Sequence, residues 1–193
     1  MWILLVVILI IAVYVIGVYN SLVTIKARIK ASIQEIGNQL KRQAELIPNL
    51  EESAKGYLKH EKEIIKLLAD ARKAVTEAVS SGNLNELSSA GEKVANLLPQ
   101  IRVAVESNPE IKGADVITKL MDELRDTSDK VMYARRTLID LTADYNVKIA
   151  TFPSNTVAGI FGFQPEKGLS TPDTGSHIEV SQSETTTPKV KLS

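Results

Sequence analysis

The first 25 residues of the chain carry no charged side chain, and residues 3–18 are almost entirely Leu, Ile and Val. At 1.5 Å per residue, a helix over residues 1–19 is roughly 28 Å long, close to the ~30 Å hydrocarbon thickness of a bilayer. We therefore expect an uncleaved transmembrane anchor over residues 1–19. A buried core helix and a signal peptide are the alternatives, but the segment lacks the basic start and cleavage site of a signal peptide.

The charges that follow the apolar segment predict its orientation. Residues 26–42 contain one acidic residue, Glu35, against five basic residues, which are Lys26, Arg28, Lys30, Lys41 and Arg42. Positively charged flanks of membrane helices stay in the cytoplasm. We expect a single-pass protein of the cell membrane with its N-terminus outside and the rest of the chain in the cytoplasm.

The remaining chain is predicted to be all-helical. Aromatic residues make up only 5% of the sequence, and apolar residues recur at steps of three and four, which is typical of amphipathic helices. Basic and acidic residues balance at 23 each, so no basic field favours nucleic acid as a partner. We expect a helical bundle over residues 20–151, a short apolar capping or docking segment over 152–168, and a disordered Ser/Thr-rich tail over 169–193.

Four apolar stripes indicate where the helices lie. They cover residues 22–47, 50–78, 84–105 and 117–149, and a turn sequence, Ser80-Ser81-Gly82-Asn83, separates the second from the third. The last stripe is the most regular and predicts a long amphipathic helix; its members are Ile117, Leu120, Leu124, Val131, Ala134, Leu138, Leu141, Tyr145 and Ile149.

Pro48 leaves two architectures open. Proline disfavours helical geometry in the preceding residue and suits the first turn of a helix, so Pro48 can mark a boundary between two antiparallel helices of a four-helix bundle. However, Ile36, Leu50, Tyr57, Ile64 and Ala71 keep a seven-residue register through this position. That register favours a three-helix rod with one very long helix kinked at Pro48.

Several motifs, taken in order, resemble the LemA family of prokaryotic membrane-anchored proteins over about residues 1–168. The resemblance implies an N-terminal membrane helix and an antiparallel four-helix bundle, which favours a turn at Pro48, but it implies no reaction and no ligand. The chain departs from the family pattern at Ser32-Ile33 and at Asn108-Pro109-Glu110-Ile111. The motifs are Tyr19-Asn20-Ser21-Leu22-Val23, Gln39-Leu40-Lys41-Arg42, Leu46-Ile47-Pro48-Asn49-Leu50, Gly56-Tyr57, His60-Glu61, Ala134-Arg135-Arg136, Tyr145-Asn146, Phe152-Pro153-Ser154-Asn155 and Gly159-Ile160-Phe161-Gly162-Phe163.

The sequence offers few groups for catalysis. It has no cysteine and only two histidines, His60 and His177, of which the second lies in the predicted tail. His60-Glu61 lacks the second histidine of a zinc-protease helix, and no glycine-rich phosphate loop or serine nucleophile elbow is present. We therefore expect no enzymatic activity, catalytic residue, metal or cofactor; an enzyme with a carboxylate-based site would need buried acids.

Three sets of residues are candidates for binding. Lys26, Arg28 and Lys30 are candidates for contact with lipid headgroups. Arg135 and Arg136 can form an anion clamp, although salt bridges to acids such as Asp129, Asp140 or Glu123 are the commoner role of such a pair. The third set is expected to plug the end of the bundle or to dock a partner or the bilayer; its members are Phe152, Pro153, Ser154, Asn155, Ile160, Phe161 and Phe163, with Ser154 and Asn155 as helix caps.

These observations predict a membrane-anchored scaffold or adaptor that binds other membrane proteins and the lipid bilayer, with self-association possible. A lipid-interacting or envelope-organising structural protein is the alternative. If the bundle runs up-down-up-down, its fourth helix returns to the membrane, so residues 152–163 are expected beside residues 19–26.

Overall fold

The computed structural model describes residues 1–54, 62–107 and 115–169. Within these ranges the chain forms five α-helices and no strand: α1 (Trp2–Ala54), α2 (Lys62–Ser81), α3 (Leu84–Ser107), α5 (Asp115–Ala150) and α6 (Ser154–Ile160). The all-helical class predicted from the sequence is therefore confirmed.

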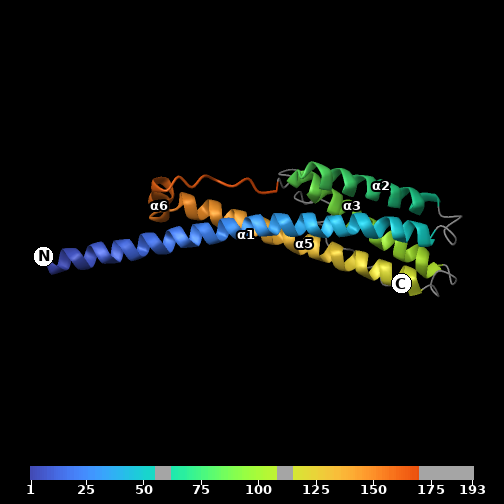
Figure 1. Cartoon of the computed structure of the whole chain (residues 1–193), viewed down its shortest axis with the longest axis horizontal. Helices are drawn as coiled ribbons and strands as arrows, with labels where there is room; N and C mark the ends of the chain where they lie inside the picture. Colours follow the sequence, from blue (N-terminus) through green and yellow to red (C-terminus); the bar gives the residue numbers. More distant parts are fainter. Residues whose placement is uncertain (55–61, 108–114, 170–193) are drawn as a thin grey trace, which may run out of the picture.

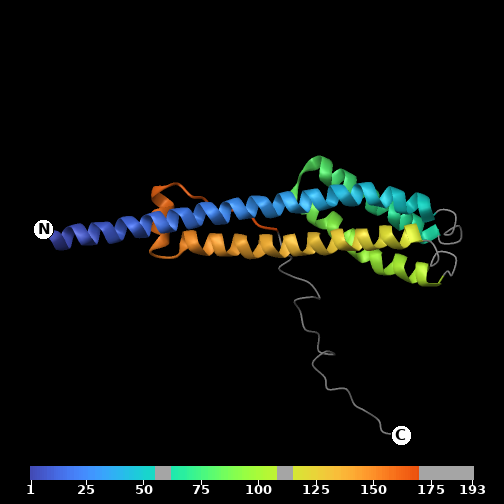
Figure 2. The same cartoon turned by 60° about the horizontal axis from the view of Figure 1, so that its bottom comes forward.

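The four long helices form an antiparallel bundle. α1 runs away from the N-terminus, α2 runs back, α3 runs out again and α5 returns along α1 (Figures 1 and 2). α1 packs most extensively against α5, α2 packs against α1 and α3, and α3 also contacts α5. This is the up-down-up-down order predicted for a four-helix bundle.

Pro48 lies inside α1, so the helix boundary that the family resemblance favoured at this residue is wrong, and the alternative of a helix that continues through Pro48 is correct at this point. Leu46, Ile47 and Leu50, on both sides of the proline, are only 7%, 0% and 1% exposed. A proline in a helix interior costs about 3 kcal/mol, and each fully buried Leu or Ile contributes about 1.5–3 kcal/mol, so burial of this stripe offsets the cost. Because α1 ends at Ala54 and α2 begins at Lys62, the bundle keeps four helices although Pro48 begins none of them.

The turn predicted around residues 80–83 lies where α2 gives way to α3. Asn83 stands before the first residue of α3, and its side-chain oxygen accepts hydrogen bonds from the backbone N–H groups of Asn85 and Glu86. These two bonds satisfy donors that have no partner within the helix, which explains why α3 begins here.

The regular stripe of the fourth long helix packs into the core as predicted. Leu124 and Leu138 are 0% exposed, and Leu120, Leu141 and Ile149 are partly buried against the core. The remaining stripe members, Ile117, Val131, Ala134 and Tyr145, are also buried, together with Thr127 and Thr142. The stripe therefore gives α5 one face against the other helices.

The rod has two differently built parts. At the four-helix end, α2 and α3 cover α1 and α5. At the base, made of residues 15–33 and 142–169, the paired α1 and α5 are accompanied only by α6 and an extended segment within the described chain (Figures 1 and 2).

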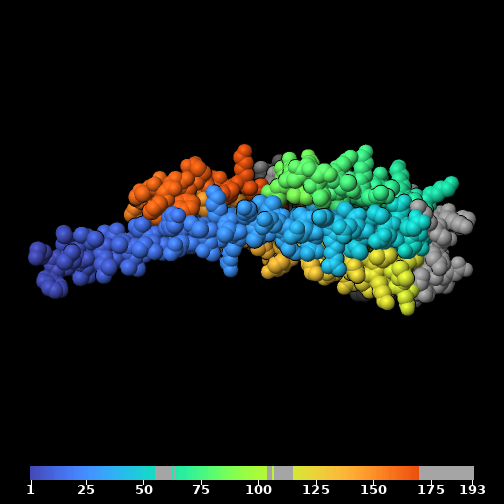
Figure 3. All heavy atoms as spheres, viewed as in Figure 1, coloured from blue at the N-terminus to red at the C-terminus, as the bar shows by residue number. Residues whose placement is uncertain are grey.

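Beyond the base, α1 stands alone. Its large apolar side chains from Trp2 to Val13 are each at least 49% exposed, and Figure 3 shows this end projecting from the rest of the molecule. By length and composition, α1 can cross a membrane. The exposed apolar side chains also show that no other described part of the chain covers this end.

Candidate docking surface at the base

Residues 152–163, here called the collar, turn the chain across the base. α5 ends at Ala150, and α6 occupies Ser154–Ile160. The hydroxyl of Ser154 donates to the backbone oxygens of Lys148 (2.6 Å) and Thr151 (2.9 Å), and α6 has no side-chain cap. The expectation that Ser154 or Asn155 caps the new helix is therefore wrong, because Ser154 instead holds the collar to the end of α5.

The collar reverses direction after α6 at Gly162, whose φ of 71° lies in the left-handed region that favours glycine. The backbone N–H of Gly162 donates to Gly159, and that of Phe163 donates to Ala158. These bonds close the helix end and direct the chain back along α1 (Figure 2).

An aromatic cluster fixes the collar beside α1. The ring centroid of Tyr19 lies 4.8 Å from that of Phe161 and 5.6 Å from that of Phe163. Val157 and Ala158 on the inner face of α6 are both 3% exposed. The predicted position of residues 152–163 next to residues 19–26 is therefore confirmed.

Residues 164–169, here called the strap, lie along the base and are held by polar side chains of α5. The hydroxyl of Tyr145 donates to the backbone oxygen of Gln164 at 3.1 Å. The side chain of Asn146 donates to the backbone oxygen of Glu166 at 2.9 Å and accepts from its N–H at 3.0 Å. Sequence reasoning gave no role to Asn146, Gln164 or Glu166, because the strap approaches α5 only in the folded chain.

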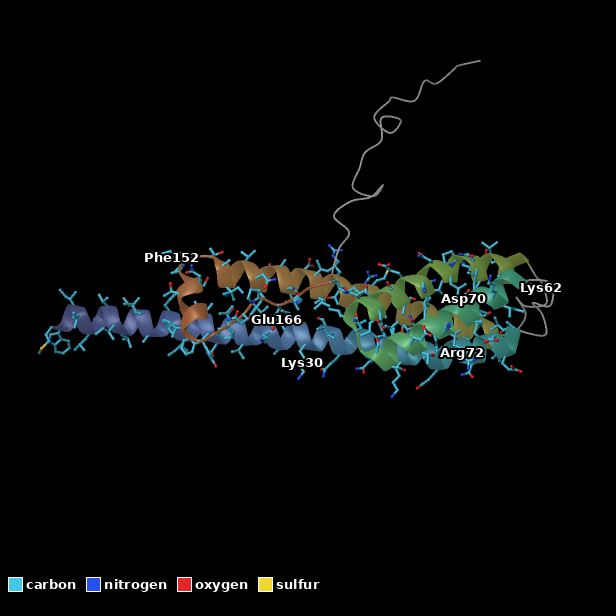
Figure 4. The ribbon with its side chains drawn as sticks, turned by 90° about the horizontal axis from the view of Figure 1, so that it is seen from above. Lys30, Lys62, Asp70, Arg72, Phe152 and Glu166 are labelled. Atoms are coloured by element: carbon cyan, nitrogen blue, oxygen red, sulfur yellow. The ribbon has the colours of Figure 1, made fainter. Side chains whose placement is uncertain are left out.

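Ion pairs and hydrogen bonds connect the same elements. Lys26 Nζ lies 2.8 Å from Glu166 Oε1, and this bond to Glu166 raises the pKa of Lys26 above its ordinary value. Lys148 Nζ donates to the hydroxyl of Ser21 at 2.5 Å. Figure 4 shows Glu166 between α1 and α5, and Phe152 at the end of α5.

Of the three cations predicted to contact lipid headgroups, Lys26 is paired within the protein, while Arg28 and Lys30 are exposed.

The pair Arg135-Arg136 lies on α5 at the four-helix end, away from the collar. Arg135 forms an ion pair with Glu92 of α3, which is none of the three acids suggested from the sequence. Arg136 is exposed. The two guanidinium groups therefore have different surroundings, and the one salt bridge joins α5 to α3.

The outer face of the collar is apolar and open. Phe152, Ile160 and Phe161 are 79%, 72% and 50% exposed, and Pro153 and Asn155 are exposed as well. Ser154 is buried and Phe163 is partly buried. Within the predicted docking set, five side chains are thus exposed, although Phe161 also contacts Tyr19, and two are used inside the molecule.

A groove of about 550 Å³ runs along α1 next to the strap. Val23, Ile33 and Phe163 give it an apolar floor, and Lys30 and Glu166 stand among its polar lining. All of its lining residues belong to α1, the collar or the strap, and none belongs to α2 or α3.

The described residues contain no group of three or more His, Cys, Asp or Glu side chains that could hold a metal ion. His60 and His177, the two histidines considered from the sequence, lie outside the described residues, as do Gly56-Tyr57 and Asn108-Pro109-Glu110-Ile111.

The comparisons with known proteins agree with the resemblance. Residues 32–190 match the model of the LemA family, which covers most of the chain. No curated protein matches the sequence.

Proposed function

The chain belongs to the LemA family, and on that premise we propose that it is a membrane-anchored helical scaffold that binds other membrane proteins and carries out no catalysis. The observation that supports this proposal is α1 itself, because one uninterrupted helix contains both the bare apolar segment and a side of the bundle. A bundle fixed in this way to its anchor has a set height and direction relative to the bilayer.

The groove beside α1 is the surface that we assign to a partner. Its floor of Val23, Ile33 and Phe163 suits the apolar face of an amphipathic helix, and the exposed Lys30 at its edge suits an acidic side chain. Val23 lies within one turn of Lys26, the first charge after the apolar segment, so the partner helix is one that emerges from the same membrane.

The proposal places the bundle in the cytoplasm, because Lys26, Arg28 and Lys30 follow the apolar segment directly. Protease added to intact cells should leave the bundle uncut. Digestion of the bundle from the outside would contradict this orientation.

Site-specific photocrosslinking in native membranes tests the scaffold role. A photoreactive residue at Ala27, which lines the groove, should give a discrete adduct with an integral membrane protein, whereas one at the exposed Met132 of α5 should give none. Lys30→Glu should reduce the Ala27 adduct. Lys119→Glu, the same charge reversal at an exposed residue near the start of α5 and far from the groove, should leave it unchanged.

The second candidate, a lipid-interacting or envelope-organising protein, is supported by the exposure of Arg28 and Lys30 near the anchor. A lysine or arginine at an anionic membrane surface contributes about 1 kcal/mol to binding. Adducts at Ala27 that contain lipid and no protein would favour this second function over the first.

A further inference from the structure

We propose that the collar is a second membrane-contacting element, whose outer face rests in the headgroup layer of the bilayer beside the anchor helix. This inference concerns lipid alone and goes beyond the scaffold role, since it holds whether or not another protein occupies the groove.

The first observation that supports the proposal is the distribution of charged residues along the sequence. The sequence has two long uncharged runs, residues 1–25 and residues 149–165. They are far apart in the sequence, but the fold brings them together, because Tyr19 contacts Phe161 and Phe163. A surface that lacks charge on both of its neighbouring segments is typical of contact with lipid and unusual for a face in water.

The charged residues that bound these runs meet at one level of the molecule. Lys26 ends the first run and pairs with Glu166, which ends the second run on its C-terminal side. Lys148, which precedes the second run, donates to Ser21, and five residues of helix separate Ser21 from Lys26 by about 8 Å. Lys26, Lys148 and Glu166 therefore mark a boundary, and the collar lies on the anchor side of it.

The exposed side chains of the collar continue the apolar surface of the anchor. Phe152 and Ile160 are 79% and 72% exposed, values as high as those of Leu9 (64%) and Val13 (63%) in the bare part of α1. Figure 3 shows the collar lying directly against α1 where the bare helix begins. The bilayer that surrounds the anchor is thus the apolar environment immediately next to these side chains.

The backbone hydrogen bonds of the collar are suited to a position beside the hydrocarbon. Polar backbone groups near the hydrocarbon need partners within the protein. The N–H groups of Asn155, Thr156, Phe161, Gly162 and Phe163 all donate to backbone oxygens within residues 151–159. The collar can therefore approach the hydrocarbon without leaving these donors unpaired.

Depth-dependent fluorescence quenching in vesicles tests the proposal. The chain has no cysteine, so a single introduced cysteine can carry a bimane label without further changes. The full chain with Ile160→Cys is reconstituted in vesicles of phosphatidylcholine with a minor fraction of phosphatidylglycerol and no other protein. We expect lipids with a shallow doxyl group to cause a larger loss of fluorescence than lipids with a deep one, and aqueous iodide to cause little loss.

Two matched positions serve as controls. A label at Val13→Cys, where the native side chain is 63% exposed in the anchor, should be quenched by doxyl lipid. A label at Val116→Cys, where the native side chain is 61% exposed at the start of α5 and far from the collar, should be quenched by iodide alone. A label at Ile160 that behaves like the one at Val116 overturns the proposal. Protection of Ile160 in native membranes combined with iodide quenching in pure vesicles also overturns it, because a protein would then be the occupant.

Discussion

At the four-helix end, side chains such as Leu68, Val94 and Leu124 are buried completely among helices, each at 0% exposure. At the base, Tyr145 and Asn146 instead hold the strap through hydrogen bonds to its backbone. The first kind of packing tolerates any well-fitting apolar residue, whereas the second depends on particular polar groups at particular positions. We therefore expect the four-helix end to supply most of the stability and the base to supply the specific arrangement beside the apolar segment of α1.

Truncation of a core residue at the four-helix end should give the largest effect. Leu124→Ala removes a side chain that is 0% exposed and should lower the free energy of unfolding by about 2–5 kcal/mol. Val147→Ala on the same helix, where the side chain is 63% exposed, should change it by less than about 0.5 kcal/mol. Denaturant unfolding of the full chain in micelles, followed by helical circular dichroism, measures both. Equal small losses of unfolding free energy in the two variants would mean that Leu124 does not pack in the core.

A pair of glycine substitutions tests how tightly the same end is packed. A Cβ atom at Gly91 would lie 2.7 Å from Cγ1 of Val131, whose branched side chain has little freedom to move, so Gly91→Ala should destabilise the bundle by about 1–3 kcal/mol. A Cβ atom at Gly37 would meet nothing within 4 Å, so Gly37→Ala should stabilise α1 by up to about 1 kcal/mol. Unfolding curves of the two variants that shift in the same direction would contradict this picture of the packing.

Removal of the polar support at the base should have a local effect. Asn146→Ala deletes two hydrogen bonds to Glu166, each worth about 0.5–1.5 kcal/mol, and should increase amide exchange in the strap while hardly changing unfolding of the bundle. Asn155→Ala, at an exposed collar position, is the control and should leave exchange of the strap unchanged. A loss of global stability as large as that of Leu124→Ala would remove the distinction between the two regions.

The four-helix end could be predicted from the sequence to a large extent, because apolar periodicity reports directly on the buried face of a helix. The stripe from Ile117 to Ile149 identified α5, and every member of it is buried or partly buried. At Pro48 the sequence left a helix boundary and a continuous helix open, because the local preference of proline opposes the burial of Leu46, Ile47 and Leu50, which prevails in the structure. The sequence pattern shows both the proline and the apolar stripe, but it does not show which of their contributions to the free energy of folding is larger.

The base could be predicted only in part. Its position followed from counting antiparallel helices, and the apolar composition of residues 152–163 indicated a packing element. The roles of Ser154 and Asn146 were missed, because their partners are backbone oxygens and an N–H of segments that approach only in the folded chain. Hydrogen bonds of this kind leave no periodic signal in the sequence.

The smallest predicted effect is a change at the base in alkaline solution. Burial raises the pKa of Tyr145 above its ordinary value of 10.0, with Lys26 opposing and Glu166 assisting the shift, and the bond to Glu166 raises the pKa of Lys26 above 10.5. In both cases the folded state holds its proton at a pH where the unfolded state has lost it, so the contribution of these groups to folding stability is complete below pH 10 and is lost as the pH rises through the raised values. For Lys26 the loss is that of its ion pair with Glu166, and for Tyr145 it arises because a buried phenolate is unfavourable. The difference in phenolate absorbance between the unaltered chain and Tyr145→Phe should therefore titrate with a midpoint above 10.0, and Glu166→Gln should lower that midpoint because it removes the negative charge beside the phenol. A midpoint at or below 10.0 in the unaltered chain would mean that Tyr145 is in contact with water, and that the strap is not held to α5 as the structure shows.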